Sequence, residues 1–215
     1  MKPTLGDVAR PEPTLDVERE FFAGGVRIVA GVDEVGRGAI AGPVTIGVVA
    51  IDANVGEIPE GLRDSKLMTP KRREAMVPTV KQWALAWGTG SATAQEIDAY
   101  GIMAALSLAG SRALAALGVQ PDVVILDGTT SFLVEEDNGP RVITQVKADQ
   151  TCASVAAASV IAKVERDALM VSLHEQFPQY GWNSNKGYGA KVHTDALRTY
   201  GVTELHRTSW NLGAS

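Results

Sequence analysis

Three apolar runs rich in β-branched residues each lead into an acidic side chain. The acids are Asp33 and Glu34 after the run over 26–32, Asp127 after 122–126, and Asp149 after 141–147. Such runs predict buried β-strands. An open α/β sheet binds ligands at the carboxyl ends of its strands, because loops from several strands converge there. The sequence therefore predicts a sheet with one acidic edge.

Carboxylates gathered at one edge repel one another and lose hydration, at a cost on the order of several kcal/mol unless a cation neutralises them. Hard oxygen ligands of this kind suit Mg²⁺ or Mn²⁺. A softer metal would find few ligands, because the chain has one cysteine and its three histidines lack the short spacing of a zinc motif. A solvated strand end is the ordinary explanation of Asp33 and Glu34 alone, and the two further acids favour a divalent-metal site.

The order of apolar and turn-forming residues predicts an α/β chain with a mixed sheet. We expect five strands, over residues 26–32, 44–51, 83–90, 123–127 and 142–147. The first two are close enough in sequence to pair antiparallel. Helices are predicted after Thr69 and Pro70, from a capping box at Thr93, over 102–117, over 151–177, and once or twice beyond Pro178.

A chain of 215 residues with 45% hydrophobic content can bury one substantial core, so we expect one main domain over 26–215, which ends in a helical segment over about 178–215. Residues 1–25 are interpreted as an N-terminal extension with a short helix over 15–22. The apolar stretches are too short for a membrane span and the N-terminus lacks the apolar segment of a signal peptide, so we expect a cytoplasmic protein. The single cysteine excludes an internal disulfide.

A formal net charge of −5 argues against indiscriminate nucleic-acid binding, but the basic residues are clustered. Several clusters lie beside the acids in sequence. Each cluster taken singly is more often a solvated face. A strip of lysines and arginines around an acidic metal centre is nevertheless what a phosphodiester substrate would require.

From about Ile28 to Trp210, the chain resembles bacterial ribonuclease HII. The resemblance rests on motifs that occur in order: DEVGRG (33–38), AGPV (41–44), DSK (64–66), EID (96–98), LDG (126–128), KAD (147–149), SVAAASVIAKVERD (154–167), FPQYGW (177–182), NKGYG (185–189) and HRTSW (206–210). One such motif would be a weak signal, whereas the ordered series is specific. The chain departs from many relatives by carrying Gly189 and Ala190 after the tyrosine where they have proline and threonine.

The resemblance implies a ribonuclease H-like fold, with a five-stranded mixed sheet flanked by helices, for the main domain. It implies an endonuclease that cleaves the RNA strand of RNA–DNA hybrids and nicks duplex DNA 5′ to single ribonucleotides, leaving 5′-phosphate and 3′-hydroxyl ends, so that ribonucleotides can be removed from DNA. The catalytic and metal-binding residues would be Asp33, Glu34, Asp127 and Asp149. Two Mg²⁺ or Mn²⁺ ions about 3.5 to 4 Å apart could clamp an in-line displacement, and we hypothesise that Asp33 bridges them.

The remaining candidate residues would contact the substrate. In the loop Gly36, Arg37 and Gly38, an ordinary turn on its own, backbone amides could read the 2′-hydroxyl that separates RNA from DNA. Tyr188 matches the family's junction-reading tyrosine, whose ring packs on the sugar beside the ribonucleotide. Expected phosphate contacts are Lys66, Lys186, Arg207 and Ser209. Ser159 and Lys163 share a helix face that could point to the substrate backbone, or Lys163 could pair with Asp167.

The sequence has three other interpretations. Ribonuclease HIII shares the fold and the carboxylates, but it usually carries a sizeable N-terminal substrate-binding domain and a different glycine loop. An actin-like ATPase or sugar kinase would need a second phosphate loop and a second domain, which the sequence does not show. A catalytically silent hybrid-binding module would lack a carboxylate, and all four are present. We expect a monomer with no obligate protein partner; the choice between Mg²⁺ and Mn²⁺ and the activity on long hybrids relative to single ribonucleotides stay open.

Overall fold

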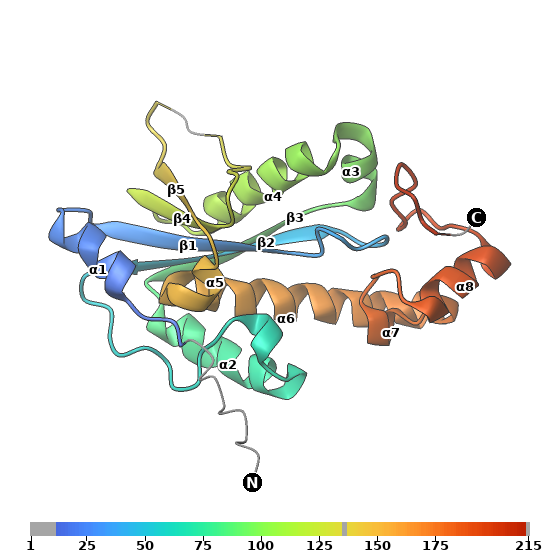
Figure 1. The fold of residues 1–215 in the computed structure, drawn as a ribbon, viewed down its shortest axis with the longest axis horizontal. Helices are drawn as coiled ribbons and strands as arrows, with labels where there is room; N and C mark the ends of the chain where they lie inside the picture. Colours follow the sequence, from blue (N-terminus) through green and yellow to red (C-terminus); the bar gives the residue numbers. More distant parts are fainter. Residues whose placement is uncertain (1–11, 135–136, 214–215) are drawn as a thin grey trace, which may run out of the picture.

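A twisted sheet of five strands forms the centre of the molecule (Figure 1). The computed structural model describes residues 12–134 and 137–213. The strands are β1 (Ile28–Val35), β2 (Val44–Asp52), β3 (Ala86–Ala92), β4 (Val123–Asp127) and β5 (Arg141–Gln145). Their spatial order is β3-β2-β1-β4-β5, with antiparallel pairs β1–β2 and β2–β3 and parallel pairs β1–β4 and β4–β5. The predicted five-stranded mixed sheet is confirmed.

Helices cover both faces of this sheet. They are α1 (Asp16–Ala23), α2 (Pro70–Trp83), α3 (Ala94–Tyr100), α4 (Ile102–Ala116), α5 (Ala148–Thr151), α6 (Ala153–Gln176), α7 (Trp182–Asn185) and α8 (Lys191–Tyr200), with short 3₁₀ turns η1 (Ser65–Leu67) and η2 (Pro178–Tyr180). In Figure 1, α3 and α4 lie over one face, α1, α2 and α6 lie over the other, and α7 and α8 lie beyond the end of the sheet. Within the described ranges, no helix is both long and apolar enough to span a bilayer.

Local signals in the sequence begin two of these helices where they were predicted. The Thr69 side chain accepts a hydrogen bond from Arg72 N, with Pro70 in the first turn of α2. At α3, Thr93 and Glu96 form the predicted capping box, in which each side chain accepts from the other residue's backbone N–H. These contacts satisfy backbone donors that a helix start leaves unpaired.

Two boundaries near the acids differ from the prediction. Strand β1 does not end at Val32 but continues to Val35, so Asp33 and Glu34 lie inside it. Asp149 does not end a strand either, because β5 stops at Gln145 and Asp149 lies in α5.

The predicted helix over 151–177 is present as α6, but Cys152, which has extended backbone angles, makes a break between α5 and α6 at its start. The break has a tertiary cause. Thr14 lies beside Cys152 in a β-bridge, accepting from Ala153 N at 2.9 Å and donating to Thr151 O at 3.0 Å. The chain is therefore extended at the point where an N-terminal segment pairs with it.

The short helix expected in the N-terminal extension is present as α1, and it packs on the core. Leu15 is 2% exposed, and Glu18 is fully buried. Glu18 Oε1 accepts from Ser154 N at 2.9 Å and from Ser154 Oγ at 2.7 Å, at the start of α6. An acid at a helix N-terminus also interacts favourably with the helix dipole. Residues 1–11 of the predicted extension lie outside the described residues.

Candidate functional site

The acidic residues of β1 and β4 occupy neighbouring strands at one end of the sheet. In β1, Asp33 is 3% exposed, whereas the side chain of Glu34 is 20% exposed. Neighbours in a strand point to opposite faces, so these two side chains lie on different sides of the sheet. The parallel register pairs Val32 with Leu126. Asp33 therefore lies beside Asp127 on the next strand.

Burial and mutual repulsion raise the pKa values of these acids. Burial raises the pKa of Asp33 well above its ordinary value, and the negative charges of Glu34, Asp149 and Asp127 add to the effect. Burial likewise raises the pKa of Glu34 and of Asp127, with a further contribution to Asp127 from Asp149. The protein thus holds carboxylates where their negative charge is costly.

Lys66 is a cation that faces this acidic group. Its Nζ lies 3.2 Å from Asp149 Oδ2, and its positive charge lowers the pKa of Asp33. Burial disfavours the charge on Lys66, but attraction by Asp33, Asp149 and Asp64 outweighs burial and raises its pKa. In this structure the ammonium group supplies part of the charge neutralisation that the acids require.

Asp64 is a fifth acid beside this group, and it was not among the predicted site residues. It is 2% exposed, and its Oδ1 accepts from Lys66 N at 2.9 Å at the start of η1. Burial raises its pKa, as do the charges of Asp149 and Asp127. The DSK motif contains this aspartate two positions before Lys66, so the sequence carried the signal.

The chemistry of the donor set fits a hard divalent cation. The ligands on offer are carboxylate oxygens, which Mg²⁺ and Mn²⁺ prefer. Asp127 Oδ1 is buried and finds no hydrogen-bond partner in the described part of the chain, so it is an acceptor in need of a cation or a donor. Within residues 12–134 and 137–213, however, no three His, Cys, Asp or Glu side chains lie close enough to hold a metal together. In the described part of the chain, the acids lie near one another but are not arranged around one shared metal position.

The two glycines beside the acids have different surroundings. Gly36 has φ +82°, and a Cβ there would lie 2.0 Å from Arg166 Nε. A Cβ on Gly38 would meet no described atom within 4 Å. Gly36 is therefore required by the protein itself, whereas the open space at Gly38 faces outward. Arg37 between them extends from this loop, with one guanidinium nitrogen 3.6 Å from Glu34 Oε1.

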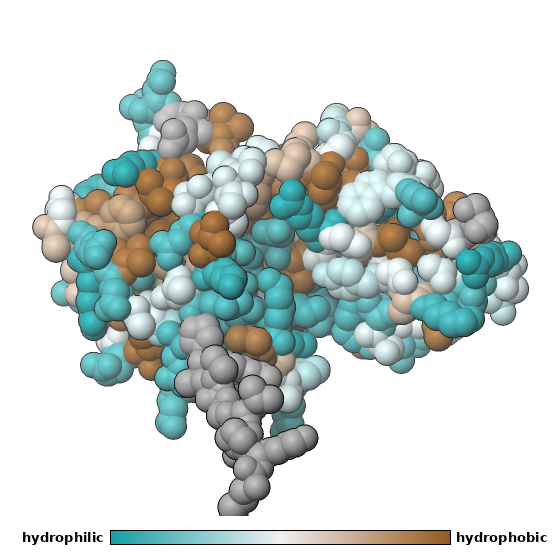
Figure 2. Space-filling model, in the orientation of Figure 1, coloured by the Kyte–Doolittle hydropathy of each residue, from teal (hydrophilic) through white to brown (hydrophobic). Residues whose placement is uncertain are grey.

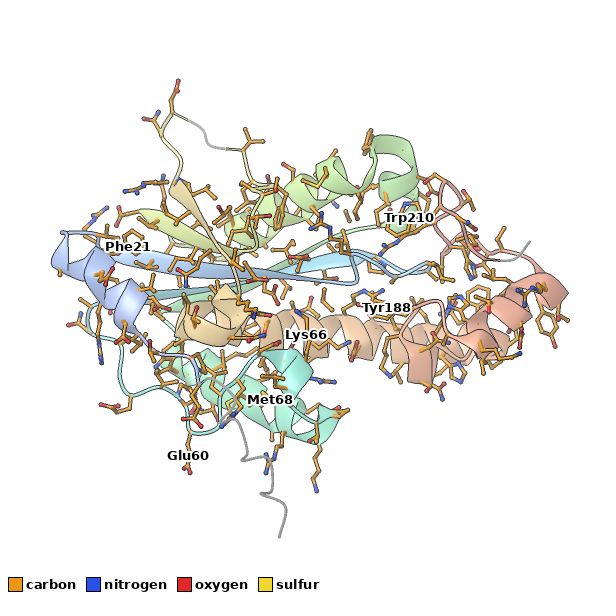
Figure 3. All side chains as sticks on the ribbon, in the orientation of Figure 1. Phe21, Glu60, Lys66, Met68, Tyr188 and Trp210 are labelled. Atoms are coloured by element: carbon orange, nitrogen blue, oxygen red, sulfur yellow. The ribbon has the colours of Figure 1, made fainter. Side chains whose placement is uncertain are left out.

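A small cavity of about 210 Å³ joins the predicted groups. Its lining includes Asp33, Glu34, the loop Gly36–Gly38, Lys66, Lys163 and Tyr188. Figure 2 shows hydrophilic side chains gathered over the middle of the molecule, and Figure 3 shows Lys66 and Tyr188 there, over α6. Tyr188 is 36% exposed, and Lys163 Nζ and Arg166 Cζ lie 5.9 and 5.6 Å from the centroid of its ring. Residues far apart in sequence thus share one recess.

Ser159 and Arg207, two of the predicted substrate contacts, do not line the recess in this structure. Ser159 is 1% exposed, accepts from Ser65 N at 3.0 Å and donates to Ala156 O at 2.8 Å. Arg207 is fully buried and donates to the carbonyl groups of Gly36 and Arg37 at 2.6 and 2.8 Å and of Gly42 at 3.1 Å. Both side chains use their hydrogen bonds on the protein, so they support the site from beneath.

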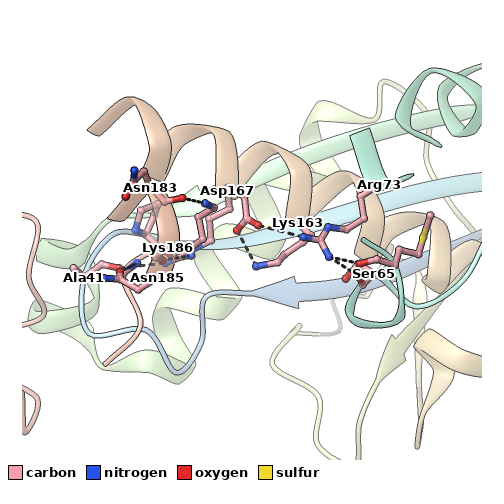
Figure 4. A network of polar contacts seen from close by, with 12 residues as sticks. Ala41, Ser65, Arg73, Lys163, Asp167, Asn183, Asn185 and Lys186 are labelled. Carbon is pink, nitrogen blue, oxygen red and sulfur yellow. Dashed lines mark hydrogen bonds and ion pairs between the residues drawn. The ribbon is translucent and has the colours of Figure 1, made fainter. Parts of the chain in front are cut away.

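A polar network fixes the turn that carries Lys66 (Figure 4). Lys163 Nζ lies 2.8 Å from Asp167 Oδ1, the pairing that the sequence allows as an alternative to a substrate contact. Asp167 also lies 3.7 Å from a guanidinium nitrogen of Arg73. Arg73 in turn donates to the carbonyl groups of Ser65 and Met68, both at 2.8 Å. Helices α2 and α6 therefore hold η1 from two sides.

Lys186 and Ser209, the other predicted phosphate contacts, lie outside the cavity lining. The Lys186 carbonyl accepts from Arg166 at 2.9 Å, and its ammonium group donates to Asn183 O. Ser209 Oγ donates to Asp98 Oδ1 at 2.6 Å. These contacts order the loops around the recess, and the predicted phosphate contacts stay predictions.

Known proteins resemble this chain both in sequence and in structure. The family model described as Ribonuclease HII matches residues 30–212. A protein named Ribonuclease HII from Streptomyces avermitilis is 49% identical over 200 residues, which are 92% of this chain and 83% of that protein. The structure of a PCNA:RNase HII complex from Archaeoglobus fulgidus has a TM-score of 0.72 at 26% identity, covering 86% of this chain and 95% of that one. Bst-RNase HIII in complex with Mn²⁺ has a TM-score of 0.68 at 19% identity, covering 88% of this chain and 68% of that one, and shows the fold alone.

Proposed function

The chain belongs to the ribonuclease HII family and is a ribonuclease H acting on RNA–DNA hybrids, and we propose that it also nicks duplex DNA 5′ to a single embedded ribonucleotide. The proposed reaction is divalent-metal-dependent hydrolysis that leaves a 5′-phosphate and a 3′-hydroxyl. Its role would be the removal of ribonucleotides from DNA. Nucleic acid is the proposed partner, with the protein acting as a monomer.

One observation carries the proposal: a single cavity is lined by two of the acids, the glycine loop and Tyr188. A phosphodiester placed over Asp33 and Glu34 would have its sugar close to the backbone of Gly38 and to the tyrosine ring. Recognition of a ribonucleotide requires a group that senses the 2′-hydroxyl next to the group that cleaves. Because the glycine loop and Tyr188 line the same recess of about 210 Å³ as Asp33 and Glu34, the geometry supports this pairing of roles.

Asp33, Glu34, Asp127 and Asp149 would hold the metal ions, two of them when substrate is bound. The unpartnered Oδ1 of Asp127 and the raised pKa values of Asp33, Glu34 and Asp127 support this donor set. When bound, such ions activate water and stabilise the leaving 3′ oxygen. The Mn²⁺ complex of the ribonuclease HIII neighbour supports a divalent metal for the fold at large.

The protein's own groups would orient the substrate. Backbone amides of the glycine loop would donate to the 2′-hydroxyl, because glycine lets the nucleic acid approach the main chain closely. The Tyr188 ring would pack on the sugar next to the ribonucleotide. Lys66 and Lys163 face the same recess and would contact the phosphate groups beside the scissile bond.

The test is cleavage of duplex DNA that contains one ribonucleotide, in Mg²⁺, in Mn²⁺ and in EDTA. We expect nicking on the 5′ side of the ribonucleotide in either metal and none in EDTA. Asp33→Asn should abolish nicking, because it removes a charge from the centre of the acidic group. Asp195→Asn, at an exposed acid on α8, is the matched control and should cleave like the wild type.

A long RNA–DNA hybrid in parallel reactions separates the two substrate preferences. Cleavage of the hybrid without nicking at a single ribonucleotide would reject the proposed specificity while leaving the hybrid activity intact. Full activity of Asp33→Asn would reject the assignment of the metal-binding acids.

A further inference from the structure

Two buried histidines connect the C-terminal segment to the loop of Tyr188. His193 in α8 is fully buried and His206 is 1% exposed. Their Nε2 atoms lie 3.0 Å apart. His193 Nδ1 lies 2.9 Å from Tyr188 O, and His206 Nδ1 lies 2.9 Å from Thr203 N. The four groups form one continuous chain of hydrogen bonds that ends at the tyrosine's backbone.

The direction of this chain is fixed at both ends. The backbone N–H of Thr203 can only donate, so His206 Nδ1 is an acceptor and the proton of that ring is on Nε2. The indole N–H of Trp182 can also only donate, and it lies 3.1 Å from His193 Nε2, which is therefore an acceptor. The proton of His193 must then be on Nδ1, where it is donated to Tyr188 O. Two independent donors give the same assignment.

Both rings are neutral in this arrangement, and their surroundings favour the neutral form. Burial lowers the pKa of His206 to about 4, and burial also lowers the pKa of His193. The rings of Tyr180 and Trp182 pack against His206 with centroids 4.8 and 5.5 Å away. A proton added to either histidine would place two N–H groups opposite each other.

The residue that follows His206 holds the other substrate loop. Arg207 donates to the carbonyl groups of Gly36, Arg37 and Gly42, as described above. Its backbone N–H donates to Ile40 O at 3.0 Å. Adjacent residues near the C-terminus thus contact the glycine loop directly and the Tyr188 loop through His193.

We infer that His193 and His206 form a directed hydrogen-bond relay that positions Tyr188 against the glycine loop for recognition of a ribonucleotide. The inference rests on the proposed function, because Tyr188 is a substrate-reading residue only there. His193 and His206 act through Tyr188 and are positioning residues. The Tyr188 carbonyl accepts from Ala190 N at 2.8 Å as well as from His193, so the relay supplies one of two donors that set the orientation of this peptide.

Two substitutions of His193 separate positioning from stability. His193→Gln keeps an acceptor near the place of Nε2 for Trp182 and His206 but loses the donor to Tyr188 O. His193→Asn keeps a donor near the place of Nδ1 but leaves the N–H groups of Trp182 and His206 without their acceptor. If His193 has a merely structural role, the less stable variant should also be the less active one. The relay predicts instead that the less stable variant, His193→Asn, is the more active one.

We expect His193→Gln to lower kcat/KM for nicking at a single ribonucleotide by about tenfold or more, because small displacements of a positioning group cost that much. His193→Asn should retain nicking within about threefold, although its Tm should fall further, because buried donors are left unpaired. Nicking is assayed well below the Tm of both variants. The affinity for Mn²⁺ is measured by calorimetry, and we expect both variants to bind it like the wild type. Equal losses of nicking, or a larger loss in His193→Asn, would overturn the relay.

The tautomers provide a test that needs no substrate. Long-range ¹H–¹⁵N correlation spectra distinguish protonated from bare ring nitrogens, and the signals are assigned by their loss in His193→Gln and in His206→Asn. We expect the Nδ1–H form of His193 and the Nε2–H form of His206. If the spectra show the reverse tautomers, the relay is rejected, even when the enzyme nicks its substrate. If they show the expected tautomers in a protein that does not nick, only the proposed function is rejected.

Discussion

At the scale of single residues, Lys66 has two roles that oppose each other. Its ammonium group, 3.2 Å from Asp149, relieves repulsion among acids that the fold has crowded together. The same charge repels any metal cation that these acids would bind. If Asp149 helps to hold a metal ion, as proposed, Lys66 would compete with that ion for the carboxylate, and an ammonium group displaced from Asp149 would be free to contact a phosphate group.

Removal of Lys66 should accordingly strengthen metal binding while it weakens cleavage. The Lys66 side chain is 64% exposed, so its ion pair is worth up to about 1 kcal/mol, and Lys66→Gln should bind Mn²⁺ about two- to fivefold more tightly. Calorimetric titration with Mn²⁺ measures the affinity, and the nicking assay measures the loss of activity. Lys71→Gln, an exposed lysine on α2, is the control. Weaker or unchanged affinity for Mn²⁺ would show that Lys66 does not compete with the metal.

Substitution of the two glycines should separate structural from functional demands. In Gly38→Ala the added Cβ meets no described atom within 4 Å, so the free energy of unfolding should stay within about 0.5 kcal/mol of the wild-type value. Nicking should nevertheless fall, because the methyl group holds the substrate away from the backbone. Gly36→Ala places a Cβ against Arg166 at a positive φ and should lose about 1 to 3 kcal/mol of unfolding free energy. Urea denaturation and cleavage rates of the two variants are compared, and wild-type nicking by Gly38→Ala would show that the substrate does not approach this backbone.

The structure brings the predicted acids near one another, whereas it places several of the predicted basic and polar contacts away from the recess. Four carboxylates after apolar runs have few ordinary explanations, and the structure makes Asp33, Glu34, Asp127 and Asp149 neighbours. Arginine and serine in a motif carry no such signal, because Arg207 and Ser159 could equally contact a phosphate or a buried carbonyl group. Burial decides between these, and it depends on packing between distant segments. Asp64 differs from these residues, because the DSK motif contains it and only its burial, at 2% exposure, depends on packing.

At the scale of elements, the distance between α6 and the sheet sets the position of the acids. A Cβ on Gly31 would lie 2.2 Å from the Ser154 carbonyl carbon, and one on Gly47 would lie 2.4 Å from Ala158 O. Glycines in β1 and β2 and alanines in α6 therefore let helix backbone and strand backbone come close. Asp33 lies two residues after Gly31 on the same face of β1, so this close contact controls its depth.

Gly31→Ala should consequently be among the most harmful single substitutions in the chain. The methyl group would push backbone atoms of α6, which cannot move aside as a flexible side chain can, and we expect a loss of about 3 kcal/mol or more. Urea denaturation followed by circular dichroism measures it. Gly56→Ala is the matched control, because its Cβ meets no described atom within 4 Å. Equal stability of the two variants would mean that α6 does not press on β1 as the structure has it.

Element boundaries could be predicted where their cause is local. Thr69 and Thr93 begin α2 and α3 through contacts within three residues, and both starts were found from the sequence. The break between α5 and α6 depends on Thr14, which lies more than a hundred positions away from Cys152. No local pattern contains that information.

At the scale of the whole molecule, the site combines loops from opposite ends of the chain. The glycine loop follows β1, and the Tyr188 loop lies between α7 and α8. Gly187 O accepts from Ile40 N at 2.9 Å and from Ala41 N at 3.1 Å, so the two loops contact each other directly. The segment around His206 and the Tyr180 and Trp182 rings form a separate core behind them. We call this separate core, together with η2, α7, α8 and the segment around His206, the C-terminal lobe; it lies outside the sheet. Recognition of the ribonucleotide would therefore depend on this lobe.

This lobe should lose stability in mild acid through His206. Its pKa falls from an ordinary value of about 6.5 to about 4 in the folded protein, so protons bind the unfolded state more strongly. The stabilisation is complete above the ordinary pKa and is lost as the pH falls toward 4. Between about pH 7 and pH 5 this single group should cost about 2 kcal/mol of unfolding free energy. The rings that face it are those of His193, Tyr180 and Trp182, and the pKa of His193 is lowered in the same direction.

Comparison with His206→Asn isolates this contribution. The variant keeps an acceptor for Thr203 N but cannot gain a proton, so its unfolding free energy should fall about 2 kcal/mol less than that of the wild type over the same pH interval. The acids around Asp33 have raised pKa values and change stability with the opposite sign, but they are present in both proteins and cancel in the difference. Urea denaturation at several pH values between about 7 and 5 gives both curves. Parallel curves would show that His206 titrates equally in the folded and unfolded states, and hence that the lobe does not bury it as the structure describes.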